Sequence, residues 1–184
     1  MFKTQGEETG GRRRLLVKVC GMTRQEDADA CMELGADLHF CLQGGLALVE
    51  GIGERVTPLQ PASGLRLLLV NPGFPVATPA VYKAYDQLGV AIHPDIDGLQ
   101  AALANGDVEA LYRSAGNALE APACWLHPSL AELKLSLAAQ GLRPLLSGSG
   151  GTFFAVLGAD SPAGELLRFW QRRLAWAGLA RTNT

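Results

Sequence analysis

A glycine-rich segment is the clearest candidate for chemistry in this sequence. It occupies residues 147–151, reads Ser-Gly-Ser-Gly-Gly and lies between two apolar runs; we call it the glycine loop. Glycines let consecutive backbone N–H groups turn toward one concavity, which can hold an anion such as a phosphate. A plain hairpin turn is the alternative, because short Gly/Ser loops are common. No lysine follows the segment, so it is not a Walker phosphate-binding loop.

A metal site is the second chemistry to consider. His39 and Cys41 would share one face of a strand, and Cys31 precedes them. A tetrahedral site needs further ligands at suitable spacing, which this sequence lacks, so we predict no metal site and expect core or edge positions. None of the four cysteines has Cys-x-x-Cys spacing, and we expect reduced, mostly buried thiols at Cys20, Cys31, Cys41 and Cys124.

The N-terminal third reads as a polar tail followed by strands and one helix. Residues 1–13 are polar, and residues 14–20 form a short β-rich run that predicts a buried strand. Thr23 and Glu26 match a capping box, so a helix is expected from Thr23 until Gly35 ends it. Residues 38–58 predict two short strands around glycine pairs, in a hairpin-like arrangement.

The remaining chain predicts a sheet with helices. Residues 65–70 are nearly all apolar, as in a central strand buried on both faces, and Thr78-Pro79 fits an N-cap and first helical position. Further helices are expected to begin near Asp97, at Asp107 and at a capping box at Ser129–Glu132, and a last helix is expected over 163–174. Strands are expected at 143–146 and 152–157, and an edge strand at 176–182. Strands at both ends around a block of helices indicate an α+β sheet covered mainly on one face.

Composition excludes several classes of protein. The 184 residues suffice for one domain and a fraction, and 48% apolar with 18% charged residues excludes intrinsic disorder. A net charge of −2 gives no drive toward nucleic acid or anionic lipid. No apolar run reaches the ~20 residues of a membrane span. Residues 1–11 lack a secretory apolar region, and Lys18 interrupts the run after the triple arginine, so we expect a cytoplasmic protein.

The sequence around the glycine loop, residues 144–155, resembles the C-terminal glycine motif of the GHMP small-molecule kinases. Within that superfamily it resembles the 4-diphosphocytidyl-2-C-methylerythritol kinases of non-mevalonate isoprenoid synthesis most closely. Other similar segments are residues 35–40, 44–54, 69–78, 116–120 and 128–133, so the resemblance covers about 35–182. It implies a kinase C-terminal domain over 65–182, an antiparallel sheet with helices on one face. A hairpin over 38–60, from the kinase N-terminal half, would precede it.

The resemblance implies ATP-dependent phosphorylation, with Mg²⁺, of one hydroxyl of a cytidine-diphosphate-linked polyol. Asp37 falls on the family's catalytic base, and Tyr82, with Thr78 and Pro79 beside it, falls on the position whose ring stacks on cytosine. The glycine loop would line the site near the phosphates and the polyol with Ser147, Gly148, Ser149, Gly150 and Gly151. From the residues alone, Asp37 could equally be a surface carboxylate and Tyr82 a core aromatic.

The sequence also departs from this family. His39 stands where the family has proline, and Ala118 replaces an acidic residue. The family's lysine near the first strand and its Gly/Ser-rich ATP loop have no counterpart. A partial chain of weak or no activity is therefore expected. The alternative is a non-catalytic domain that only binds a ligand or pairs with a separate N-terminal half.

Residues 14–37 resemble a different family, the phosphoribosylanthranilate isomerases. They match the first β-strand and helix of that barrel, and Cys20 falls on its general base. One βα unit cannot close a barrel, so isomerase activity is only a remote alternative. Both families share the Leu-Gly-Ala-Asp of residues 34–37, which suggests a junction of two genes. We expect the hairpin to pair with strand 14–20, and its free edge to favour oligomers.

Overall fold

A computed structural model provides the coordinates of this chain. It describes residues 17–20, 46–50, 55–59, 64–89, 92 and 94–182. The polar tail, the helix expected after Thr23, the tetrapeptide at 34–37 and Asp37 itself lie outside the described residues. The architecture below therefore concerns the sheet, its helices and the glycine loop.

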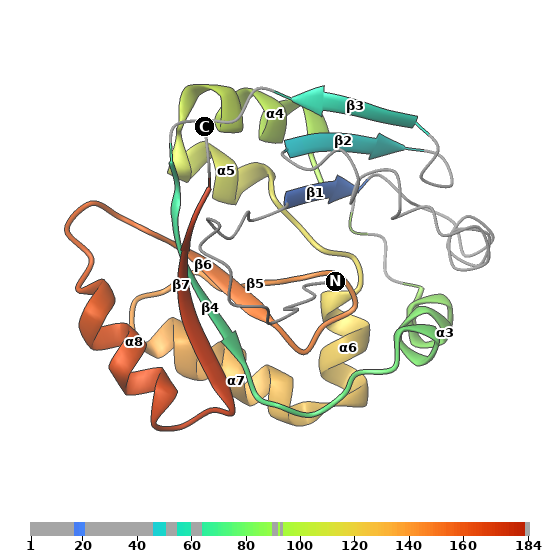
Figure 1. The fold of residues 1–184 in the computed structure, drawn as a ribbon. Helices are drawn as coiled ribbons and strands as arrows, with labels where there is room; N and C mark the ends of the chain where they lie inside the picture. Colours follow the sequence, from blue (N-terminus) through green and yellow to red (C-terminus); the bar gives the residue numbers. More distant parts are fainter. Residues whose placement is uncertain are drawn as a thin grey trace, which may run out of the picture.

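A four-stranded antiparallel sheet forms the centre of the molecule (Figure 1). Its strands lie in the order β5 (Leu145–Leu146), β6 (Phe153–Leu157), β4 (Arg66–Asn71) and β7 (Trp176–Arg181). Strand β4 is paired on both sides, with Leu68 opposite Ala155 of β6 and opposite Leu179 of β7. The predicted central strand and the predicted C-terminal edge strand are both confirmed.

One face of this sheet carries the larger apolar core. Leu68 and Val70 of β4 point to this face with Phe153 of β6, and each is at most 1% exposed. Four helices cover it: α3 (Thr78–Leu88), α6 (Glu120–Leu126), α7 (Pro128–Ala139) and α8 (Ala163–Gln171). Alternation along β4 thus directs every second side chain to these helices.

The opposite face carries a second, smaller core. Leu67 of β4 and Val156 of β6 pack there against two helices, α4 (Ile96–Asn105) and α5 (Val108–Ser114). Most helices therefore lie on one face, as expected, and these two lie on the other. Helices with antiparallel sheets confirm the α+β class.

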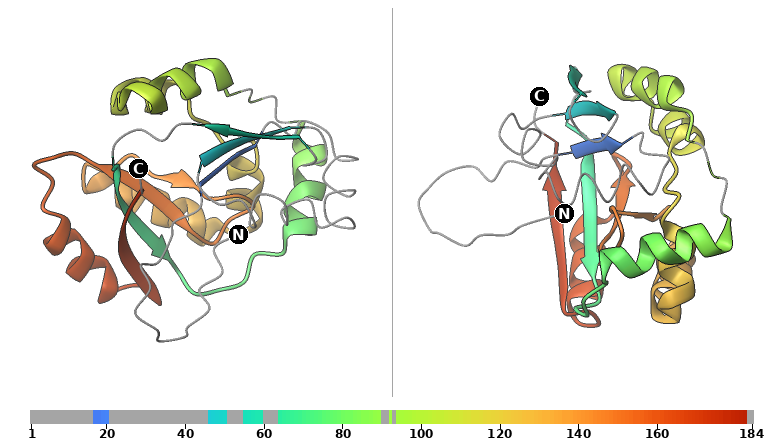
Figure 2. Two further views of the ribbon diagram at one scale, coloured as in Figure 1. Left: turned by 45° about the horizontal axis from the view of Figure 1, so that its top comes forward. Right: turned by 90° about the vertical axis from the view of Figure 1, so that its right-hand side faces the viewer.

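A small three-stranded sheet lies beside α4 and α5 (Figure 2). Its middle strand β2 (Leu46–Glu50) pairs antiparallel with β3 (Arg55–Leu59) and parallel with β1 (Val17–Cys20). The hairpin and its pairing with the strand predicted over residues 14–20 are both confirmed. Leu46 joins the small sheet to the second core of the main sheet.

Aspartates cap two helices, α5 at the predicted Asp107 and α4 two residues before the predicted start at Asp97. Asp95 accepts from Gly98 N at 3.0 Å before α4, and Asp107 accepts from Ala110 N at 2.9 Å before α5. Asx side chains stabilise a helix start in this way by accepting an otherwise unpaired N–H group.

Two other predicted caps are wrong. The N-cap of α3 is Ala77, which places Thr78 inside the helix, and α7 begins at Pro128 after His127, without a side-chain cap. Ser129 is therefore the second residue of a helix already begun, and its capping box with Glu132 does not form. Proline in the first turn provides the start instead, because its missing N–H would have no intrahelical partner there.

Helix α6 was missed by the sequence analysis. It begins directly after Leu119 and contains Pro122 in its first turn, where a proline costs no backbone hydrogen bond. The polar Gly-Asn-Ala segment before it reads as a loop. No helix within the described ranges is long and apolar enough to cross a membrane.

Two leucines of α7 test this packing. Leu130 is fully buried and Leu135 is 70% exposed. We expect Leu130→Ala to lower the free energy of unfolding by about 2–5 kcal/mol, because it leaves a cavity. Leu135→Ala should change it by less than about 0.5 kcal/mol. Urea denaturation followed by circular dichroism measures both, and equal losses would contradict the packing of α7 described above.

Candidate functional site

The glycine loop connects β5 to β6 as a tight turn. Ser147 N donates to Thr152 O at 2.9 Å, and Gly150 N donates to Ser147 O at 3.1 Å. Gly148, Gly150 and Gly151 have φ angles of 57°, 114° and 78°. Side chains rarely adopt such angles, so this path requires glycine.

Asn71, the last residue of β4, holds the far end of the loop. Its Nδ2 donates to Thr152 Oγ1 at 2.9 Å, and its Oδ1 accepts from Gly73 N at 2.7 Å. A Cβ atom on Gly151 would lie 3.4 Å from Asn71 Nδ2. Asn71 therefore joins the end of the central strand to the glycine loop at close range.

Helix α3 contacts the tip of the loop through Thr78. The hydroxyl groups of Thr78 and Ser149 lie 2.7 Å apart and share a hydrogen bond. Because Thr78 is in the first turn rather than at the cap, its hydroxyl is available for this contact. Tyr82 is half-buried and lies four residues further, on the same side of the helix as Thr78. Pro79 is exposed in the first turn.

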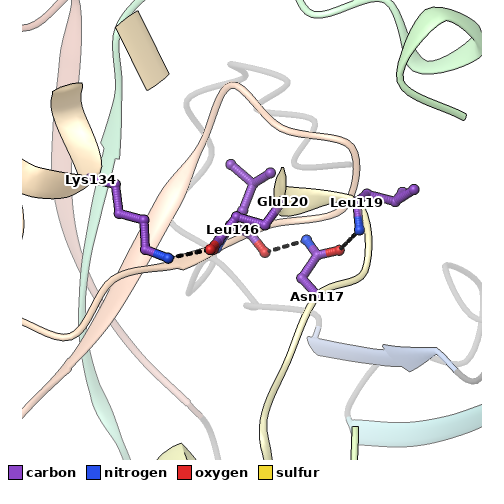
Figure 3. Close-up of polar contacts among 5 residues, drawn as sticks. All are labelled: Asn117, Leu119, Glu120, Lys134 and Leu146. Carbon is purple, nitrogen blue, oxygen red and sulfur yellow. Dashed lines mark hydrogen bonds and ion pairs between the residues drawn. The ribbon is translucent and has the colours of Figure 1, made fainter. Parts of the chain in front are cut away.

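Asn117 holds the near end of the loop (Figure 3). Its Nδ2 donates to Leu146 O at 2.9 Å and to Gly148 O at 2.8 Å, and its Oδ1 accepts from Leu119 N at 2.9 Å. Both protons and the oxygen of this amide side chain are thus used. This one side chain therefore binds two residues, Leu146 and Gly148, that lie 29 and 31 positions further along the chain.

Glu120 lies beside Asn117 and is 18% exposed. One carboxylate oxygen accepts from Leu146 N at 3.1 Å, and the other forms an ion pair with Lys134 of α7. Burial raises the pKa of the neighbouring Cys124 thiol, the charge of Glu120 raises it further, and Lys134 opposes the rise. Cys124 is therefore a neutral thiol at pH 7, and it is free and half-buried.

Three loop amides are left available for a ligand. In the part of the chain that the structure describes, the N–H groups of Gly148, Ser149 and Gly151 donate to no protein acceptor. Successive N–H groups on a glycine-rich turn form a concave site for anions. Donors of this kind suit an anion such as phosphate and need no lysine or arginine beside them.

The structure brings together most of the predicted site residues. The five residues of the glycine loop, Thr78 and, one helical turn away, Tyr82 lie on neighbouring elements. Asp37 lies outside the described residues, as do His39, Cys41 and Cys31. No three His, Cys, Asp or Glu side chains come together anywhere in the described ranges.

Sequence reasoning missed Asn71, Asn117 and Glu120 as site residues. Each belongs to a segment that carries the kinase resemblance, and the two asparagines precede or follow turn-forming glycine or proline. Asparagine beside such residues often bonds local backbone, which was the available signal. The long-range bonds to the loop depend on the fold.

Comparison with known proteins supports the kinase resemblance. The chain is 38% identical over 149 residues to a 4-diphosphocytidyl-2-C-methyl-D-erythritol kinase of Symbiobacterium thermophilum, covering 80% of this chain and 53% of that protein. A kinase of the same name from Listeria monocytogenes is 35% identical, with 74% and 47% covered. The chain thus spans about half the length of the curated relatives it matches. No family model matches the chain.

Solved structures give the same result for the fold. A crystal structure of 4-(cytidine 5'-diphospho)-2C-methyl-D-erythritol kinase matches with a TM-score of 0.62 and 36% identity, over 83% of this chain and 56% of that one. A mevalonate kinase of L. major, solved with R-mevalonate, matches with a TM-score of 0.51 and 14% identity, over 70% and 45%. The α+β fold is therefore shared with the GHMP kinases.

Two glycines with positive φ, one in the glycine loop and one outside it, test what a side chain costs at each position. Gly141, with φ 74°, has open space around it, whereas Gly151, with φ 78°, faces Asn71. We expect Gly141→Ala to cost about 1–2 kcal/mol of unfolding free energy from φ alone. Gly151→Ala should cost about the same 1–2 kcal/mol, because a Cβ atom 3.4 Å from Asn71 Nδ2 makes only an ordinary van der Waals contact. Chemical denaturation measures both, and a much larger loss for Gly151→Ala would contradict this spacing.

Proposed function

We propose that this chain supplies the substrate-binding half of a small-molecule kinase. Its substrate would be a polyol linked to cytidine diphosphate, and the transferred group the γ-phosphoryl of ATP. The observation that carries the proposal is the glycine loop, whose three available amides face no described acceptor. The similarity to kinases named for such a substrate supports it.

The binding roles follow from the chemistry of each element. The amides of Gly148, Ser149 and Gly151 would hold a phosphate oxygen, since backbone donors need no change in protonation. Tyr82 would place its ring against the cytosine, because aromatic rings stack on bases. The bond between Thr78 and Ser149 fixes the helix that carries Tyr82 relative to the loop, and so fixes the spacing of the two binding groups.

Asp37 would act as the general base in the proposed reaction. Its carboxylate takes the proton of the polyol hydroxyl while that oxygen attacks the γ-phosphorus. A new P–O bond forms to the polyol, the bond from the γ-phosphorus to the bridging oxygen breaks, and ADP leaves with the electron pair. Mg²⁺ would enter as part of the ATP complex.

A non-catalytic domain is the second candidate. The relatives are about twice as long as the matched part, so an additional half could carry the ATP contacts. Such a domain would bind the cytidine ligand or a separate half without turnover. An isomerase is not favoured, because the described strands form two sheets with antiparallel pairs rather than a parallel barrel.

The substitution Asp37→Asn tests the catalytic role. Phosphate transfer from ATP to the cytidine-diphosphate-linked methylerythritol is measured for the purified chain, with and without an added N-terminal half of a related kinase. We expect kcat to fall by about 10²–10⁴-fold, because the general base is lost, while substrate affinity is retained. No turnover by the wild-type chain under both conditions would favour the non-catalytic candidate, and unchanged kcat would contradict the role of Asp37.

Two tyrosines of α3 test the binding role. Tyr82 and Tyr85 are both half-buried on the same helix. We expect Tyr82→Ala to weaken binding of cytidine 5'-diphosphate by about 1–3 kcal/mol, roughly 5- to 150-fold in Kd, from lost stacking. Tyr85→Ala serves as the matched control and should leave Kd within about twofold. Isothermal titration calorimetry measures both, and an equal effect of the two substitutions would contradict stacking on Tyr82.

A further inference from the structure

The outer edge of β5 has backbone N–H and C=O groups that point away from the sheet and need hydrogen-bond partners. Among the described strands, β5 is an edge strand of two residues that pairs only with β6. In an antiparallel pair, hydrogen-bonded and non-hydrogen-bonded positions alternate. Ser147 bonds across to Thr152, so Leu146, opposite Phe153, occupies a non-hydrogen-bonded position. The N–H and C=O groups of Leu146 therefore point away from β6.

Two side chains satisfy these outward groups. Leu146 O accepts from Asn117 Nδ2 at 2.9 Å, and Leu146 N donates to Glu120 Oε2 at 3.1 Å. A neighbouring strand would provide one donor and one acceptor at the same place. Leu146 is 3% exposed, so leaving these groups unpaired would be costly.

Asn117 also reaches past the strand into the loop. The same Nδ2 that binds Leu146 O donates its second proton to Gly148 O at 2.8 Å. The side chain itself is held because its Oδ1 accepts from Leu119 N, and the backbone of Asn117 is held because its carbonyl accepts from Glu120 N. The direction in which the glycine loop leaves the sheet therefore depends on this one amide group.

We propose that Asn117 is a positioning residue for the ligand-binding glycine loop. Together with Glu120 it takes the place of a missing neighbour strand along β5, and its second proton fixes the carbonyl of Gly148. The peptide group whose carbonyl is held by Asn117 also contains the N–H of Ser149, one of the three available amides. Asn117 thereby orients a ligand donor without touching the ligand. This inference rests on the proposed function for what the loop binds, but not for how the loop is held.

Asn117→Asp tests the proposal with almost no change in shape. The carboxylate removes both donors and places negative charge against two carbonyl oxygens. We expect the amide resonances of Gly148, Ser149 and Gly151 to shift in ¹H–¹⁵N spectra, while those of β4 and β7 stay in place. Affinity for cytidine 5'-diphosphate should fall at least tenfold. Asn105→Asp is the matched control, since it makes the same charge change at an exposed helix end and should alter neither reading.

Glu120 provides a second pair of variants. Glu120→Gln keeps an oxygen that can accept from Leu146 N and should retain the loop resonances, whereas Glu120→Ala should shift them and speed hydrogen exchange at Leu146. If Asn117→Asp does not fold, Asn117→Ser takes its place, because a hydroxyl can donate one of the two bonds. Loop resonances that coincide with the wild type in Asn117→Asp or Asn117→Ser would overturn the proposal.

The two proposals fail in different ways. If the wild-type chain does not bind cytidine 5'-diphosphate, the proposed function is wrong, while the loop resonances still decide the role of Asn117. If the wild type binds and Asn117→Asp binds equally well with an unchanged loop, the positioning role is wrong and the function stands.

Discussion

Strand β4 is the constraint on which the rest of the structure depends. Its side chains are buried on both faces, so both faces of the sheet must be covered. Four helices cover one face, and two helices with the small sheet cover part of the other. β4 also ends at Asn71, so the strand that organises both cores delivers the first anchor of the glycine loop.

The glycine loop is held at three points that come from three separate parts of the chain. Asn71 holds its end, Thr78 its tip and Asn117 its beginning. Each contact is a side chain bonding a short glycine-rich turn, which has few apolar contacts of its own. Holding the loop in this way leaves the amides of Gly148, Ser149 and Gly151 without an acceptor among the described residues, and preorganised donors are what a phosphate site requires.

Sequence reasoning succeeded where the signal was local. The apolar run at 65–70, the start of α5 at Asp107 and the glycine loop all depend on neighbours in the chain, and all were predicted. The start of α4 was predicted two residues late, at Asp97 instead of Asp95. The cap at Thr78 was wrong because the hydroxyl has a partner in Ser149, 71 residues away. Asn117 and α6 were missed for the same reason: their partners on β5 and α7 become neighbours only when the chain folds.

The central claim is that the glycine loop and Tyr82 form one ligand site. A crystal structure of the chain with cytidine 5'-diphosphate tests it directly. The account predicts a phosphate oxygen within hydrogen-bond distance of the amides of Gly148, Ser149 or Gly151, and the cytosine ring against Tyr82. A ligand bound elsewhere, or bound with neither the loop nor Tyr82 in contact, would contradict it.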